Sequence, residues 1–509
     1  MTQRKPLGLL AAAAALAVAL AGCSAGSGTD KSAQPDRTLT IGMTSDVATF
    51  DPAQSQVGGP NQYMLPVYDT LIRKDDDGKL VPMLATSWKY TDSSNTVFEL
   101  TIRDGVKFSD GTPLTTEAVA ASLQRFRDGK GPRATGLAYV TDIKAVDAKT
   151  VRLTLSAPDP ALAENLTLVA GMIVNPKADA AALTSEPAGA GPYVLDTADT
   201  RRGDVYVYKR NKNYYNASAF PFATLNIKVL TDPTARLNAV KTGQVDATYG
   251  LAPQVAEAKA SGLTVITGAG GWQGLFLNDR LGAKAPALAK VQVRQAINYA
   301  IDRKAMLKAL ALDQGEITTQ IFAPGTPAYD KSLDDKYPFD PKKAKELMAE
   351  AGYADGFTLT MPQLDSLTPA AYPIIEQQLA DIGITVKYVP ATAAAGVAQF
   401  TADTYPAYML VWGSSNNWLD ATQLIAPTAA FNTFHVADPK ITGLMSQIQA
   451  STGQKQDALF KELSAYVVDQ AWFDPWYFNQ NAMFVDSKVK LTPYNYAIMP
   501  PIYNYSPAD

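Results

Sequence analysis

The sequence predicts an α/β protein built from two lobes, because two strand–helix–strand patterns occur far apart in the chain. In the first pattern, an apolar strand over residues 225–230 leads into Asp232 and Pro233, which are typical of a helix N-cap and of the first helical position. A second strand is expected over residues 245–249. Strands joined by a helix usually lie parallel in one sheet, so this pattern predicts a βαβ unit.

The second pattern has the same arrangement much later in the chain. Strands expected over residues 357–361 and 384–389 flank a helix that should begin at Thr368–Pro369 and end at Gly383. The two patterns share no sequence repeat. Their separation therefore indicates two α/β lobes that are equivalent in architecture only.

The composition is that of an ordinary globular protein, with 47% hydrophobic and 18% charged residues. A chain of 509 residues is longer than a single core usually supports, which predicts several domains. Removal of residues 1–22 takes away two of the 45 basic side chains and none of the 49 acidic ones, which leaves a net charge of −6. This mild acidity and the lack of a basic block make nucleic acid and anionic membrane surfaces poor partners.

The N-terminus resembles a bacterial lipoprotein signal. A basic pair at residues 4–5 precedes an apolar run over residues 7–21, and small residues then lead to Cys23, the only cysteine. The run is shorter than the roughly 20 residues that a membrane-spanning helix needs. We expect a signal peptide over residues 1–22, a lipid on Cys23 that anchors the protein outside the cytoplasm, and a flexible linker over residues 23–37. The alternative is an ordinary secretory signal.

The mature chain is expected to begin with a strand over residues 39–43. Alternation predicts another strand over residues 97–102, and Thr116 is expected to cap the helix that follows. The acidic run Asp75–Gly78 suggests calcium, but no glutamate closes a twelve-residue loop. We interpret this run as a turn.

The same region carries three short motifs in succession. They are Pro-x-Leu-Ala-x-Ser-Trp over residues 82–88, Arg-x-Gly-Val-x-Phe over residues 103–108 and Asp-Gly-x-Pro over residues 110–113. This stretch resembles the signature of the family 5 solute-binding proteins, the oligopeptide, dipeptide and nickel binders that serve ABC importers. Ser109 departs from the family pattern, which has histidine there.

The resemblance continues along nearly the whole mature chain, at residues 189–193, 291–306, 339–353 and 458–478. It implies a type II periplasmic-binding-protein-like fold, with two lobes joined by a hinge and an additional inserted domain. The expected division is lobe I over residues 38–66, 186–269 and 481–509, the inserted accessory domain over residues 67–185, and lobe II over residues 270–480.

Catalytic motifs are scarce. His435 is the only histidine, and no Gly-x-Ser-x-Gly elbow or phosphate-binding motif accompanies it. The glycine cluster over residues 268–274 has glutamine where a dinucleotide fingerprint has its third glycine. We therefore expect no catalytic residue, no metal site and no cofactor. A pair of carboxylates for hydrolysis would leave no local mark, so an exported lipoprotein hydrolase stays an alternative.

A polar, aromatic segment over residues 409–421 is the main candidate for a ligand site, because apolar residues lead there from a strand into a loop. In the peptide binders that this segment resembles, an aspartate of the loop meets the ligand's α-amino group, and Asn417 stands at that position. We therefore expect a solute that presents no free ammonium group to this loop. An ordinary surface loop is the alternative. The candidate residues of the loop are Trp412, Ser414, Ser415, Asn416, Asn417 and Trp418.

Other candidates lie where further strands are expected to begin or end. They are Ser45, Asp46, Tyr249, Trp272 and Gln273. Tyr249 and Trp272 are also large enough to be core residues.

The resemblance implies a solute-binding protein that captures a peptide or peptide-like solute between two lobes and delivers it to an ABC permease and its ATPases. The expected form is a monomer anchored to the cell membrane. An oligosaccharide or a metal chelate is the alternative ligand, and a sensor or chaperone that serves no transporter is a further alternative function. Fold alone does not choose the ligand.

Overall fold

The computed structural model describes residues 37–55, 61–364, 368–391, 400–413, 416–493 and 499–508. Residues 36–509 form one compact unit. The predictions that concern the signal peptide, Cys23, Ser414 and Ser415 fall outside the described residues.

The centre of the protein is a nine-stranded sheet. Strand β1 (Thr38–Met43) lies between β10 (Thr224–Val229) and β11 (Ala247–Gly250) and is parallel to both. Helix α4 (Pro233–Lys241) connects β10 to β11, and its N-cap is Asp232, whose side chain accepts a hydrogen bond from the Ala235 N–H at 2.7 Å. The first predicted βαβ unit is therefore confirmed.

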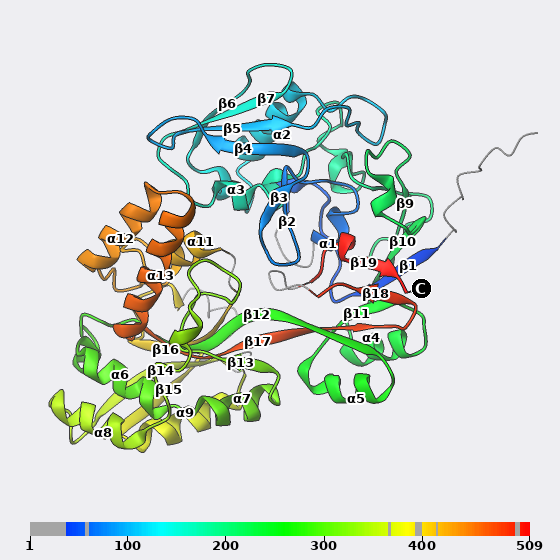
Figure 1. Ribbon diagram of the computed structural model, residues 1–509. Coiled ribbons are helices and arrows are strands. Elements are labelled where there is room, and N and C mark those ends of the chain that lie inside the picture. The colour runs from blue at the N-terminus through cyan, green and yellow to red at the C-terminus, as the bar shows by residue number, and fades with distance from the viewer. Residues whose placement is uncertain are drawn as a thin grey trace, which may run out of the picture. The chain divides into compact units, whose positions relative to one another are not determined.

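Antiparallel strands extend this sheet on both sides. On one side lie β9 (Val205–Arg210) and β8 (Tyr193–Leu195). On the other side, β11 pairs with β17 (Phe473–Val485), which pairs with β12 (Thr264–Leu277), which in turn pairs with β16 (Ala407–Trp412). Figure 1 shows β12 and β17 running side by side over their whole length, so these two strands carry the chain from one half of the sheet to the other.

The pairing of β12 with β17 changes register between Ala269 and Trp272. Gly270 and Gly271 occupy this irregularity, and a Cβ on Gly271 would lie 2.1 Å from the carbonyl oxygen of Trp412. Only glycine allows the neighbouring backbone to come this close. The proposed boundary between the lobes, at residues 269 and 270, falls at this point of the strand.

The region between β1 and β8 contains a separate four-stranded antiparallel sheet in the order β4 (Ala85–Tyr90), β5 (Val97–Ile102), β7 (Thr150–Leu155) and β6 (Val140–Ala145). Helix α2 (Thr116–Asp128) packs on it. The predicted cap at Thr116 is wrong by one residue. The Thr115 hydroxyl accepts from the Ala118 N–H, whereas Thr116 donates to the carbonyl of Asp147.

A small hairpin, β2 (Ile72–Lys74) and β3 (Leu80–Pro82), precedes this sheet. Its connection contains the acidic run, and Asp75 accepts hydrogen bonds from the backbone N–H groups of Asp77 and Lys79. This run is the expected turn.

The second βαβ unit consists of β14 (Phe357–Leu364) and β15 (Ile384–Ala391), which pair in parallel, and of α9 (Ala371–Ala380). The expected helix start at Thr368–Pro369 is wrong by two to three residues, because Thr368 has a φ of 34° and is not helical. The helix ends at Ala380, three residues before the expected Gly383, which has a φ of 87° and lies in the turn that leads into β15.

Helices cover both sides of the strands in this half, as Figure 1 shows. One group comprises α6 (Val291–Ala300), α7 (Arg303–Ala311) and α8 (Pro341–Glu350), and the other comprises α11 (Asn417–Leu424), α12 (Pro439–Gln449) and α13 (Gly453–Asp469). The remaining elements are short: α1 (Asn61–Met64), α3 (Leu162–Asn165), α5 (Val255–Ala260), β13 (Gly315–Ile317), β18 (Val489–Leu491) and β19 (Tyr505–Pro507).

The buried side chains form separate cores. One joins β1, the four-stranded sheet and the C-terminal strands, whereas two others fill the opposite sides of the half that contains β14 to β16. Among the described residues, no helix has the length and apolarity that a membrane crossing requires. The same residues contain no group of three His, Cys, Asp or Glu side chains placed to hold a metal ion.

Candidate functional site

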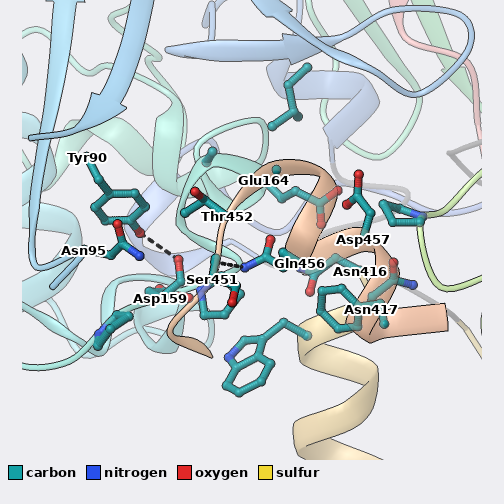
Figure 2. A pocket seen from close by; sticks show the side chains of 18 of the residues that line it. Tyr90, Asn95, Asp159, Glu164, Asn416, Asn417, Ser451, Thr452, Gln456 and Asp457 are labelled. Carbon is teal, nitrogen blue, oxygen red and sulfur yellow. Dashed lines mark hydrogen bonds between the residues drawn. The ribbon is translucent and has the colours of Figure 1, made fainter. Parts of the chain in front are cut away.

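A cavity of about 760 Å³ lies where the region that carries the four-stranded sheet faces the starts of two helices, α11 and α13. This region, expected as an inserted domain over residues 67–185, is called the inserted region below. Figure 2 shows side chains from both sides that line it. On the side of the inserted region, the lining residues come from β4, β5 and the segments around residues 77–80 and 158–164. On the opposite side, they come from residues 325–327, 416–418 and 449–460.

Aromatic rings form the floor on the side of the inserted region. Trp88 and Tyr90 alternate with exposed residues along β4, and Phe98 lies on the neighbouring strand. Tyr90 packs against Phe98 with ring centroids 5.0 Å apart, and its hydroxyl donates to the backbone carbonyl of Asp159 at 2.8 Å. This hydrogen bond fixes the loop that carries Asp159.

Asp159 is the most buried acidic side chain of the cavity, with 5% of its surface exposed. Its Oδ1 accepts a hydrogen bond from the Ala161 N–H at 2.9 Å, and it has no ion pair with a basic side chain among the described residues. Burial disfavours the charged form and raises the pKa of Asp159 to about 6.

The opposite wall begins at α11. Asn416 is the N-cap of this helix, and its side chain accepts from the Leu419 N–H at 2.7 Å. The Asn417 amide accepts from the Ala328 N–H at 3.1 Å and donates to the Thr326 hydroxyl at 2.9 Å. Both amides are therefore held in place by residues of the same wall.

The start of α13 completes this wall. Thr452 is the N-cap residue, but its side chain makes no capping hydrogen bond. Gln456 folds back and donates to the carbonyl of Ser451 at 2.6 Å. Asp457 also lines the cavity, and desolvation raises its pKa.

Two hydrogen bonds join the walls at one end of the cavity. The Gln449 side chain donates to the carbonyl of Pro158 at 3.0 Å, and the Asn95 side chain donates to the carbonyl of Ala450 at 3.4 Å. The inserted region therefore touches the half that carries α13.

Acidic side chains outnumber basic ones around the cavity. The acids are Asp77, Asp159, Glu164 and Asp457, and the bases are Lys79 and Lys89. Glu164 is paired with Lys74 at 3.1 Å and Asp77 lies 3.8 Å from Lys79. The arrangement offers aromatic faces, amides and carboxylates, which can bind a polar organic solute.

The family model for bacterial extracellular solute-binding proteins, family 5, matches residues 79–429, which is more than half of the chain. The protein belongs to this family. The family predicted from the motifs is therefore confirmed, and family 5 proteins are extracytoplasmic.

Curated relatives extend over nearly the full length of this family 5 protein. The glutathione-binding protein GsiB of Pectobacterium atrosepticum is 25% identical over 504 residues, which cover 94% of each chain. The nickel-binding periplasmic protein of Escherichia coli is 31% identical over 337 residues, which cover 63% of this chain and 62% of the relative.

A solved structure shows the same fold. HbpA2 from Haemophilus parasuis superposes with a TM-score of 0.83 at 21% identity, and the match covers 92% of this chain and all of that one. The type II periplasmic-binding-protein-like fold predicted from the sequence is confirmed.

The structure brings three of the predicted site residues of the family 5 protein together in the cavity. They are Asn416, Asn417 and Trp418, which begin α11. Trp412 is half-buried at the end of β16 and does not line the cavity. Its Nε1 donates to Asp420 at 3.0 Å, and its ring packs edge-on against Phe431 with centroids 4.9 Å apart.

Trp272 and Gln273 lie inside the protein. Trp272 is fully buried, and its ring stacks on Phe276 with centroids 5.0 Å apart. Gln273 accepts a hydrogen bond from the Tyr477 hydroxyl at 2.8 Å. Both residues lie within β12, which is buried on its two faces at this point, and neither lines the cavity.

Ser45, Asp46 and Tyr249 lie outside the cavity as well. Ser45 and Asp46 are exposed, and the Tyr206 hydroxyl donates to Asp46 at 2.6 Å. The Tyr249 hydroxyl donates to Asn481 at 2.9 Å, which links β11 to β17. Their role in solute binding stays a prediction.

Sequence reasoning missed the residues that the inserted region contributes, namely Trp88, Tyr90 and Asp159. The alternation of aromatic and polar residues along β4 was a usable signal for the first two. Asp159 lies between two prolines in a connection, and nothing in the sequence indicates that this loop reaches a helix of the other lobe.

Proposed function

We propose that this family 5 protein captures a peptide or peptide-like solute outside the cytoplasm and delivers it to an ABC permease. The observation that carries the proposal is the family match together with a solute-sized cavity whose walls belong to different parts of the chain. Ligand pockets commonly measure about 300–1,000 Å³. A cavity of about 760 Å³ is large enough for a short peptide.

A peptide-like solute is also favoured by the relatives. The glutathione-binding protein that matches over 94% of this chain takes a tripeptide. Trp88, Tyr90 and Trp418 offer flat faces for apolar side chains, while the amides of Asn95 and Gln456 suit peptide groups.

The similarity to the nickel-binding periplasmic protein favours a second candidate, a metal chelate. A bare ion is a poor fit, because the described residues hold no group of three metal-ligating side chains. A chelate would instead be bound through its organic part. An exported hydrolase is disfavoured, since these relatives are solute-binding proteins.

Native mass spectrometry of the purified protein tests the proposal directly. We expect a co-purified mass of a few hundred daltons that is lost on denaturation, and calorimetric titration of short peptides should show saturable one-to-one binding. Binding of a metal chelate with no peptide binding would favour the second candidate. Turnover of the bound solute would contradict both.

A further inference from the structure

Among the described residues that line the cavity, Asp159 is the only strongly buried acidic side chain, and it has no basic partner there. The residue is 5% exposed, and its carboxylate accepts one backbone hydrogen bond, from Ala161. A buried carboxylate without a cation is costly, and proteins usually pair such groups. The described residues provide no basic partner for it.

The surroundings hold the loop in place without neutralising this charge. The hydrogen bonds from Tyr90 and Gln449 go to the backbone carbonyls of Asp159 and Pro158, not to the carboxylate. Glu164 already has Lys74 as its partner. Asp457 on α13 adds a second negative group to the same cavity.

We propose that Asp159 binds the ammonium group of the solute, so that the cavity selects an amine-bearing, cationic end. This inference rests on the proposed function and names the part of the solute that the cavity takes. A cation at Asp159 would gain a charge-assisted hydrogen bond and would relieve the buried charge. Trp88 and Tyr90 lie on the same wall and offer ring faces to the cation and its neighbouring carbons.

The start of α11 on the opposite wall offers no charged group for this role. The Asn417 amide carries no charge, and its oxygen already accepts from the Ala328 N–H while its nitrogen donates to the Thr326 hydroxyl. The sequence predicted that the solute presents no free ammonium to the Asn417 loop. The structure offers a different place for that group, on the inserted region.

Calorimetry with two forms of one peptide tests this assignment. The probes are trialanine with a free amino terminus and the same peptide N-acetylated, titrated into wild type, Asp159→Asn and Asp142→Asn. Asp142 is a half-exposed aspartate of the same inserted sheet that pairs with Lys144 and does not line the cavity, so its substitution makes the same change in charge away from the cavity. We expect wild type and Asp142→Asn to prefer the free amine by at least about ten-fold, the factor for one hydrogen bond to a charged group. Asp159→Asn should bind both forms with similar affinity.

The other outcomes of these titrations distinguish a failure of the inference from a failure of the proposed function. Equal binding of both forms to wild type overturns the inference and leaves the peptide-binding function standing. A preference for the free amine that survives in Asp159→Asn also overturns it. Binding of neither form contradicts the peptide-binding function and the inference together. The Asp159→Asn variant is expected to fold, since the substitution removes a buried charge, and its circular dichroism spectrum verifies this.

Discussion

At the scale of single residues, Asp159 predicts how stability depends on pH. Burial raises its pKa to about 6, above the ordinary value of 3.8. The folded state therefore binds this proton more tightly than the unfolded state, so the residue costs stability above about pH 6, and the cost disappears as the pH falls below about 4. Replacing Asp159 by Asn should raise the free energy of unfolding at pH 8 by on the order of 3 kcal/mol.

Urea unfolding of wild type and Asp159→Asn between pH 4 and pH 8 measures this effect. The gain should shrink steadily as the pH falls. Asp142→Asn is the control, because that half-exposed carboxylate has a pKa below its ordinary value through Lys144 and gains nothing from losing its charge. A gain of equal size at pH 4 and pH 8 would mean that packing, not the buried charge, distinguishes the variants.

At the scale of elements, the backbone of β12 explains a requirement for glycine. A Cβ at residue 271 would lie 2.1 Å from the carbonyl oxygen of Trp412, whereas a Cβ at Gly413, the residue after β16, would meet no atom of the described residues within 4 Å. Gly271→Ala must therefore push β12 away from β16. We expect a loss of roughly 1–3 kcal/mol in unfolding free energy, as for other overpacked sites, and almost no loss for Gly413→Ala. Equal stability of the two variants would contradict this account.

The elements also show how far the sequence could predict the structure. The two βαβ units follow from local signals, namely Asp232–Pro233 as cap and first turn and Gly383 in the turn that leads into β15, and these signals act within a few residues. The sequence predicted the start of α9 too early, because Thr368 has a left-handed backbone conformation that no local sequence pattern indicates. Trp272 was proposed for the pocket because a strand was expected to begin there, but β12 already runs from Thr264 and buries the ring.

The cavity itself was only half predictable. Asn416, Asn417 and Trp418 follow a strand end, which is a local pattern. Asp159 is brought near them by the packing of the inserted region against the end of α12, where the Gln449 side chain donates to the carbonyl of Pro158. Such a contact joins residues nearly three hundred positions apart, and one sequence carries no signal for it.

At the scale of the whole molecule, the resemblance of the first 23 residues to a lipoprotein signal predicts a membrane anchor. Cys23→Ser should remove the site of lipid attachment, and a diacyl group provides most of the membrane affinity of such a protein. We expect the variant to shift from the membrane fraction to the soluble fraction, or to remain uncleaved. Fractionation followed by immunoblotting measures this distribution, and an unchanged membrane fraction would contradict the lipid anchor. The mature body should still fold, since Cys23 is the only cysteine and no disulfide is lost.

Solute binding is expected to be linked to closure of the lobes. Strands β12 and β17 carry the chain between them, and in the part of the chain that the structure describes two side-chain hydrogen bonds, from Asn95 and Gln449, join the walls beside the cavity. A solute that touches both walls binds the closed form more tightly and so shifts the population toward it. At 100 times its dissociation constant, the solute should stabilise the native state by about 2.7 kcal/mol.

Thermal melting and small-angle X-ray scattering on the same samples test the linkage. The melting temperature should rise with solute concentration, and the radius of gyration should fall over the same concentration range. A rise in melting temperature without any change in scattering would mean that the solute binds without closure. A rise caused by divalent cations alone would contradict binding through organic groups, because the amides, carboxylates and aromatic rings of this cavity have no arrangement that would hold a bare ion among the described residues.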